Sequence, residues 1–133
     1  MYYKVVSKTG CDKLQSAVTK ESACVTYSLN KWIGSIIPHS KLFVFTSLET
    51  AMALVDYHMA INGYIHIYEC QVKNPHKIKT IVSCDYSKKT FEKFWTTKHN
   101  KQKIDDKRFW ITEPLTGTVV VDAVKLTKLV KVF

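Results

Sequence analysis

The residues best suited to chemistry lie in the segment 91–110, which reads FEKFWTTKHNKQKIDDKRFW. Aromatic residues bracket a run of lysines in this segment. Single-stranded nucleic acid and nucleotides bind where rings can stack on bases and cations can hold phosphates. We therefore predict that the segment binds nucleic acid or another anionic nucleotide ligand, with an affinity that falls steeply as salt rises. The predicted ligand-binding residues of this segment are Lys98, Lys101, Lys103, Lys107, Arg108 and Trp110.

The charge distribution favours the same kind of partner. The net charge is +9, and residues 73–108 alone carry eleven Lys and Arg against four Asp and Glu, an excess of seven. Charge gathered in one segment favours an anionic partner. Two other interpretations stay open: the lysines could form a solvated loop over core aromatic rings, or they could dock on an acidic host protein.

Length and composition predict one compact domain spanning 1–133. The chain is long enough to bury a single core, 46% of its residues are apolar, and it contains only four glycines and three prolines. The first ten residues lack the apolar run of a signal peptide, and no later stretch has the roughly 18 apolar residues of a spanning helix. We therefore expect a cytoplasmic protein without membrane contact, whose four cysteines are free thiols.

Hydrophobic periodicity predicts several strands, each rich in β-branched and aromatic residues and bounded by turn residues. The tail 125–133 is also interpreted as a strand, although lysine recurs there at every third position. Residues 31–40 are interpreted as a loop or a single helical turn, with Trp32 packed under it. The other predicted strands are 2–6, 14–19, 24–29, 41–45, 64–72, 77–83 and 118–124.

Two helices are predicted in addition to the strands. The helix 48–61 has apolar residues at helical spacing, and Thr46 and Glu49 form a capping box at its start. The helix 86–98 would be capped by Asp85 and would bury aromatic residues on one face. Together these elements predict an α+β fold, a mostly antiparallel twisted sheet with two main helices packed on it.

The strand-to-helix junction FTSLE contains Thr46 and Ser47 at a helix start, where free backbone N–H groups can hold an anion. Both residues are therefore included among the predicted ligand-binding residues. The junction also resembles the central element of ADP-ribosyltransferase folds, where an aromatic-Ser-Thr-Ser stretch leads into a helix. The resemblance implies an enzyme in which Lys4 replaces the usual arginine or histidine and Glu69 or Glu113 is the acidic residue. The alternative is that Thr46 and Ser47 only cap the helix.

No metal, cofactor or standard hydrolytic site is predicted. His66 and Cys70 are four residues apart on a predicted strand, which separates them by roughly 13 Å and prevents them from sharing a zinc ion. Asp105 and Asp106 are interpreted as a solvated turn that balances neighbouring lysines.

Across most of its length the chain resembles small accessory proteins of phages and other viruses. Those proteins open with a Tyr-Lys-Val-Val strand, continue with a Leu-Phe-Val-Phe-x-Ser-Leu-Glu-x-Ala element and close with a Val-Lys-Leu tail. The resemblance implies a non-enzymatic viral-type protein that inhibits a host process, such as host defence, by binding or sequestration. A homodimer through the long apolar strand at 119–133 is a further expectation. The matching residues are 3–6, 42–51, 67–75, 117–119 and 124–126.

Overall fold

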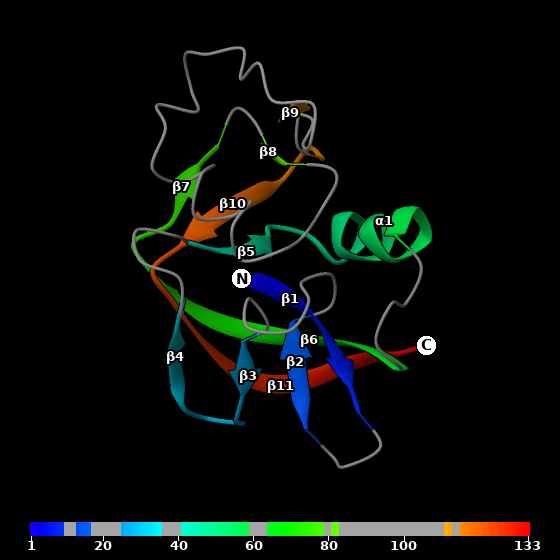
Figure 1. Ribbon diagram of the computed structural model, residues 1–133, viewed down its shortest axis with the longest axis vertical. Coiled ribbons are helices and arrows are strands. Elements are labelled where there is room, and N and C mark those ends of the chain that lie inside the picture. Colours follow the sequence, from blue (N-terminus) through cyan, green and yellow to red (C-terminus); the bar gives the residue numbers. More distant parts are fainter. Residues whose placement is uncertain are drawn as a thin grey trace.

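The computed structural model shown in Figure 1 describes residues 1–9, 13–16, 25–35, 41–58, 64–78, 81–82, 111–112 and 115–133. In this part of the chain, nine strands form one sheet, and every strand pairing is antiparallel. The strands are β1 (Tyr2–Lys8), β2 (Leu14–Ser16), β3 (Thr26–Tyr27), β4 (Trp32–Gly34), β5 (Leu42–Phe45), β6 (Tyr64–Lys73), β7 (His76–Lys77), β10 (Thr118–Val121) and β11 (Ala123–Val132). The short strands β8 (Ile81–Val82) and β9 (Ile111–Thr112) pair with each other.

The main path of the sheet is β4-β11-β6-β1-β5-β10-β7, and it forks at β1. One edge of β1 pairs along its whole length with β6. On its other edge, Tyr3 pairs with β5, whereas Val6, Ser7 and Lys8 pair with β2. The pair β2 and β3 therefore leaves the main path as a second branch.

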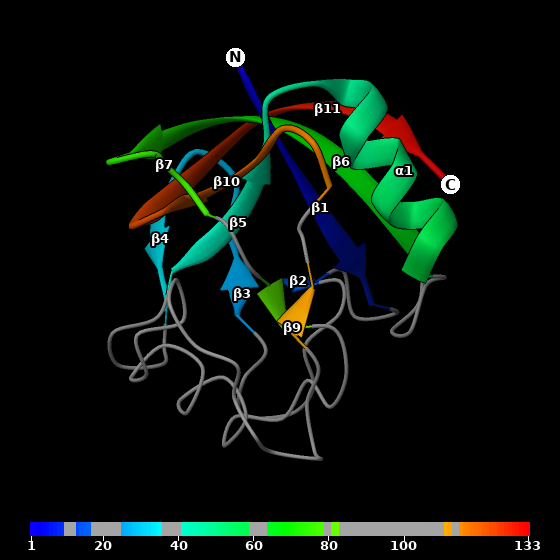
Figure 2. The same cartoon turned by 90° about the horizontal axis from the view of Figure 1, so that it is seen from above.

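The fork creates two apolar cores, one on each face of β1 and β6. The larger core gathers apolar residues from both branches, including Tyr27 of β3, Val44 of β5 and Val119 of β10, against Leu126 of β11. The second core lies on the opposite face, where the helix packs. Figure 2 shows the helix on one side of β1 and β6 and the β2–β3 branch on the other.

The helix α1 (Leu48–His58) covers the second core with the face that includes Ala51, Met52 and Val55. These residues contact apolar side chains of the sheet such as Ile67, which is fully buried. β5 and β6 are both antiparallel to β1, which lies between them, so they run parallel to each other. α1 is the crossover between these two parallel strands. In the described ranges, no helix is long and apolar enough to cross a membrane.

The predicted α+β class with two main helices is wrong. The described residues form a mostly antiparallel β structure with one helix. The predicted helix 86–98 lies outside them. The sequence did not predict β4 and β9, because they have only three and two residues, too few to show an alternating pattern, and are held by partners distant in the chain.

Individual strand predictions had mixed outcomes. The strands predicted at 2–6, 41–45 and 64–72 are confirmed as β1, β5 and β6, and the tail 125–133 is confirmed as part of β11. The interpretation of Trp32 as packed under a loop was wrong. Trp32 begins β4, pairs with Lys125 of β11 and is 39% exposed. Its backbone is extended because β11 provides a neighbouring edge, which local sequence cannot show.

Candidate functional site

Most of the residues predicted to bind a ligand lie outside the residues that the structure describes. The six predicted ligand-binding residues of the segment 91–110 lie outside the described residues, and so do the aspartate pair interpreted as a turn and Glu113, an acidic residue that the resemblance implies. They are Lys98, Lys101, Lys103, Lys107, Arg108, Trp110, Asp105, Asp106 and Glu113. Their assignment stays a prediction, and the geometry below comes from other residues.

Thr46 and Ser47 lie at the start of α1, and the chain itself occupies their main polar groups. The Thr50 backbone N–H donates to the Ser47 side-chain oxygen at 3.2 Å, which makes Ser47 the N-cap. The Thr46 N–H donates to the Gly117 carbonyl at 2.9 Å. The predicted capping box is therefore wrong, because the N–H that Glu49 would accept from is already bonded. That both residues also bind a ligand stays a prediction.

Ser47→Ala is expected to lower the free energy of unfolding by about 1 kcal/mol, because it removes the acceptor for the Thr50 N–H. Thr46→Ala should have a smaller effect, since the bond from Thr46 to Gly117 uses backbone atoms. Chemical denaturation of the two variants would measure the difference. Equal losses would contradict the assignment of Ser47 as the cap.

Lys4 and Glu69, which the ADP-ribosyltransferase resemblance would bring together, point to opposite faces of the sheet. Glu69 is directly opposite Tyr3, and Lys4 is directly opposite Tyr68. Since successive residues of a strand alternate in direction, Lys4 faces the larger core and Glu69 faces the helix side. The described residues therefore do not assemble the pair that such an enzyme would need.

Lys4 is a buried cation in the larger core. Its ammonium group donates to the Phe43 carbonyl at 2.7 Å and lies 5.7 Å from the centre of the Tyr27 ring. Burial lowers the pKa of Lys4 to about 8, against an opposing electrostatic effect of Cys70. Burial also raises the pKa of Cys70 to about 12. These two groups are therefore held in the core with little access to solvent, and each has its charged form disfavoured.

His66 and Cys70 both lie on β6, the strand predicted for them, and Cys70 is a buried free thiol. Burial, together with the positive charge of Lys8, lowers the pKa of His66. Among the described residues, no three His, Cys, Asp or Glu side chains gather closely enough to hold a metal ion.

Three lysines of β11 lie in a row on the helix side of the sheet. They occur at every third position, a spacing that would alternate between faces in a regular strand. The register shifts twice, between Leu126 and Lys128 and between Leu129 and Lys131. As a result Lys125, Lys128 and Lys131 pair with Gln71, Glu69 and Ile67, which are alternate residues of β6. Residues directly opposite each other share a face, so all three lysines point the same way.

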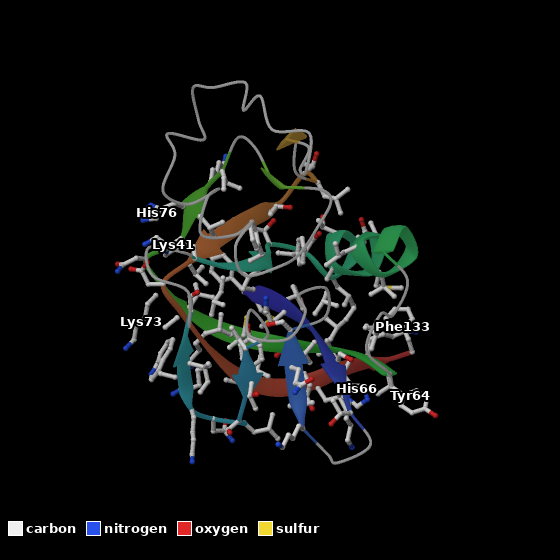
Figure 3. All side chains as sticks on the ribbon, viewed as in Figure 1. Lys41, Tyr64, His66, Lys73, His76 and Phe133 are labelled. Carbon is white, nitrogen blue, oxygen red and sulfur yellow. The ribbon has the colours of Figure 1, made fainter. Side chains whose placement is uncertain are left out.

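Trp32 stands at one end of this row. It is directly opposite Lys125, and its ring centre lies 5.4 Å from the Lys125 ammonium and 4.5 Å from that of Lys73. Each such cation–π contact contributes about 0.5–1 kcal/mol at an exposed site. At the other end, the Lys131 ammonium lies 5.8 Å from the centre of the Phe133 ring. Figure 3 shows Lys73 and Phe133 toward opposite ends of β11.

We call this surface the lysine face and define it by six residues, Trp32, Lys73, Lys125, Lys128, Lys131 and Phe133. Its four lysines lie near one acid, Glu69, and none of them takes part in an ion pair within the part of the chain that the structure describes. Nearby Asp122 does not offset the charge, because Lys41 and Asn74 both donate to it. These two hydrogen bonds lower the Asp122 pKa and keep the carboxylate engaged. The lysine face is therefore a positively charged strip between two exposed rings.

No protein-family model, curated protein or solved structure matches the chain.

The lysine face was missed as a site in the sequence. Lysine at every third position of the tail is compatible with both a strand and a helix, so the spacing alone does not indicate a shared face. A strand with lysines at i, i+3 and i+6 can place them on one face only if it contains bulges. Together with that requirement, this spacing was the one feature of the sequence that could have indicated a shared lysine surface. The role of Trp32 depended on finding β4, for which the local sequence offered no pattern.

Proposed function

We propose that the protein binds nucleic acid through the lysine face. The observation that supports the proposal most is the double register shift of β11, which turns Lys125, Lys128 and Lys131 to one side. Lysines in such a row hold phosphates and release counterions when they bind. The predicted function as an accessory protein acting by sequestration is compatible with this activity, which requires no catalytic group.

The spacing of the row favours a polymer over a single nucleotide. Successive lysines are opposite residues two apart on β6, a separation of roughly 7 Å along the strand. The whole row therefore extends over roughly 14 Å. Only a ligand with repeated charges can contact all three lysines at once. The exposed rings at both ends favour a polymer that also carries bases.

Edge protection is a second explanation for lysines and bulges on this strand. Lysines and bulges on exposed edges hinder unwanted strand pairing. In the described part of the chain, β4 pairs with β11 from Ala123 to Lys125 and the Asn30 N–H donates to the Leu126 carbonyl, so the edge is uncovered only from Thr127 on. Lys125 lies where β4 does cover the edge, and edge protection does not account for it. Loss of binding on changing Lys125 would therefore support the proposed function specifically.

The test is a salt titration of binding to a fluorescent oligothymidylate. We expect the variant Lys128→Gln with Lys131→Gln to bind more weakly and to show a salt slope, in log–log form, that is smaller by about 1.4, since each phosphate contact on a single strand contributes about 0.7. Lys125→Gln should reduce the slope by about 0.7.

The matched control is Lys13→Gln with Lys77→Gln, which removes the same charge from two exposed lysines elsewhere in the fold. The control variant should retain the wild-type slope. Absence of binding by the wild-type protein at low ionic strength would overturn the proposal. An equal loss of affinity in the control and in the Lys128 and Lys131 variant would also overturn the proposal, because binding would then depend only on net charge.

A further inference from the structure

We infer that Trp32 is a stacking platform for a nucleobase, and that the lysine face therefore selects single-stranded over duplex nucleic acid. This inference rests on the proposed function and adds the class of ligand and the residue that recognises it.

The position of Trp32 is unusual for a large aromatic residue. It lies on a three-residue strand at the end of the main path of the sheet and keeps 39% of its surface exposed. Its neighbour Ile33 faces the other way and packs against the larger core. The backbone of β4 is therefore anchored by Ile33, while the indole of Trp32 is presented on the lysine face.

The residues beside the indole leave room for a flat ligand. The next row across the strands consists of Gly34, Ala123 and Lys73, of which two have little or no side chain. The only charged groups recorded over the ring are the ammonium groups of Lys73 and Lys125, among the residues that the structure describes. Both belong to flexible side chains that can move aside.

A single strand can use both parts of this arrangement at once. Stacking of a base on a tryptophan contributes more than one exposed cation–π contact, so a base can displace the ammonium group from the ring face that it covers. The displaced ammonium of Lys73 or Lys125 remains within reach of a phosphate next to that base and can form an ion pair with it. In a duplex the base faces are covered by neighbouring pairs, so Trp32 has nothing to stack on.

The end of β11 repeats the same pairing of a ring with a lysine. Phe133 is 43% exposed, its backbone N–H donates to the Ile65 carbonyl at 2.9 Å, and Lys131 lies over its ring. Lys128 stands between the two ring-and-lysine units. This order is suited to an extended strand that lies along β11.

The test compares Trp32→Leu with Trp32→Phe on three probes: an oligothymidylate, an abasic oligonucleotide of the same length, and a duplex. We expect Trp32→Leu to lower affinity for the oligothymidylate about tenfold and to leave affinity for the other two probes unchanged. The salt slope should stay at its wild-type value, because no phosphate contact is lost. Trp32→Phe keeps an aromatic ring, so it should lose less affinity for the oligothymidylate than Trp32→Leu. The comparison shows whether binding depends on an aromatic surface.

Failure of the inference differs from failure of the proposed function. If Trp32→Leu weakens all three probes equally, or weakens none, Trp32 is not a stacking platform, although the lysine variants could still show phosphate binding. Wild-type affinity that is equal for oligothymidylate and duplex would also overturn the inference. Thermal unfolding of both Trp32 variants confirms that the comparison is between folded proteins.

Discussion

Lys4→Met is expected to raise the free energy of unfolding at pH 7 by about 2 kcal/mol. Burial lowers the Lys4 pKa from 10.5 to about 8, which corresponds to about 3 kcal/mol of unfavourable free energy for keeping the ammonium charged in the core at neutral pH. Methionine is unbranched, flexible and uncharged, so it can fill the space without that penalty. The lost hydrogen bond to the Phe43 carbonyl offsets about 1 kcal/mol of the gain.

The stability gain of Lys4→Met should become smaller as the pH rises above about 8. Between about pH 8 and pH 10.5 the unfolded chain holds the Lys4 proton and the folded protein does not, so wild-type stability rises with pH in this window. Cys70 acts in the opposite direction from pH 9 to about pH 12, because its folded-state pKa is raised and the unfolded chain releases its proton first. Of these two groups, only Lys4 contributes between pH 8 and pH 9. The advantage of Lys4→Met should therefore shrink by about 1 kcal/mol in that interval.

Chemical denaturation at pH 7, 8 and 9 measures both effects. Lys77→Met is the matched control, because Lys77 is exposed on β7 and its replacement removes the same charge without changing the core. The control should show no comparable gain at pH 7. A loss of stability in Lys4→Met at pH 7, or a gain in stability that does not change with pH, would show that the Lys4 charge does not destabilise the core.

Gly117→Ala is expected to lower the free energy of unfolding by about 3 kcal/mol, from backbone strain and steric overlap together. Gly117 has a φ angle of 92°, a conformation that residues with side chains rarely adopt. A Cβ at this position would also lie 2.8 Å from the Thr46 hydroxyl oxygen and 3.2 Å from that of Thr50. The close approach is required because the Gly117 carbonyl accepts from the Thr46 N–H and the Thr116 carbonyl accepts from the Thr50 hydroxyl at 2.8 Å.

Gly34→Ala is the matched control for this prediction. Gly34 lies on a strand, and among the described residues an added Cβ would meet only the Asp122 carbonyl, at 3.4 Å. Its replacement should therefore change stability by less than about 1 kcal/mol. Combining Gly117→Ala with Thr46→Ala should recover part of the loss, because the nearest clashing oxygen is removed. Equal stability of the Gly117 and Gly34 variants, measured by denaturation, would contradict the close packing of this turn against α1.

The turn at Gly117 also explains why the N-cap of α1 was predicted one residue too early, at Thr46 instead of Ser47. Thr46 and Glu49 have the residue types of a capping box, so local sequence favours a cap at Thr46. The tertiary structure assigns the Thr46 N–H to a carbonyl 71 positions along the chain, and Ser47 becomes the cap instead. A distant partner thus outweighed a local preference of about 1 kcal/mol.

The sequence by itself determined the elements whose pattern is long enough to read. β1 and β6 carry β-branched and aromatic residues over at least seven positions, the tail strand carries valine, threonine and leucine over ten, and α1 shows apolar residues at helical spacing. Such patterns are local, because each residue's direction follows from the geometry of its own element. They identified these elements but not the fold class, since short strands such as β4 and β9 depend on partners far along the chain.

Only the tertiary structure decided which residues share a surface. The lysines at every third position of the tail have no common face in a regular strand. They acquire one because the register of β11 against β6 shifts twice. Trp32 joins them because β4 pairs with the start of the same strand. Register and strand order are relations between segments separated in the chain, so their free energy depends on contacts that no local pattern contains.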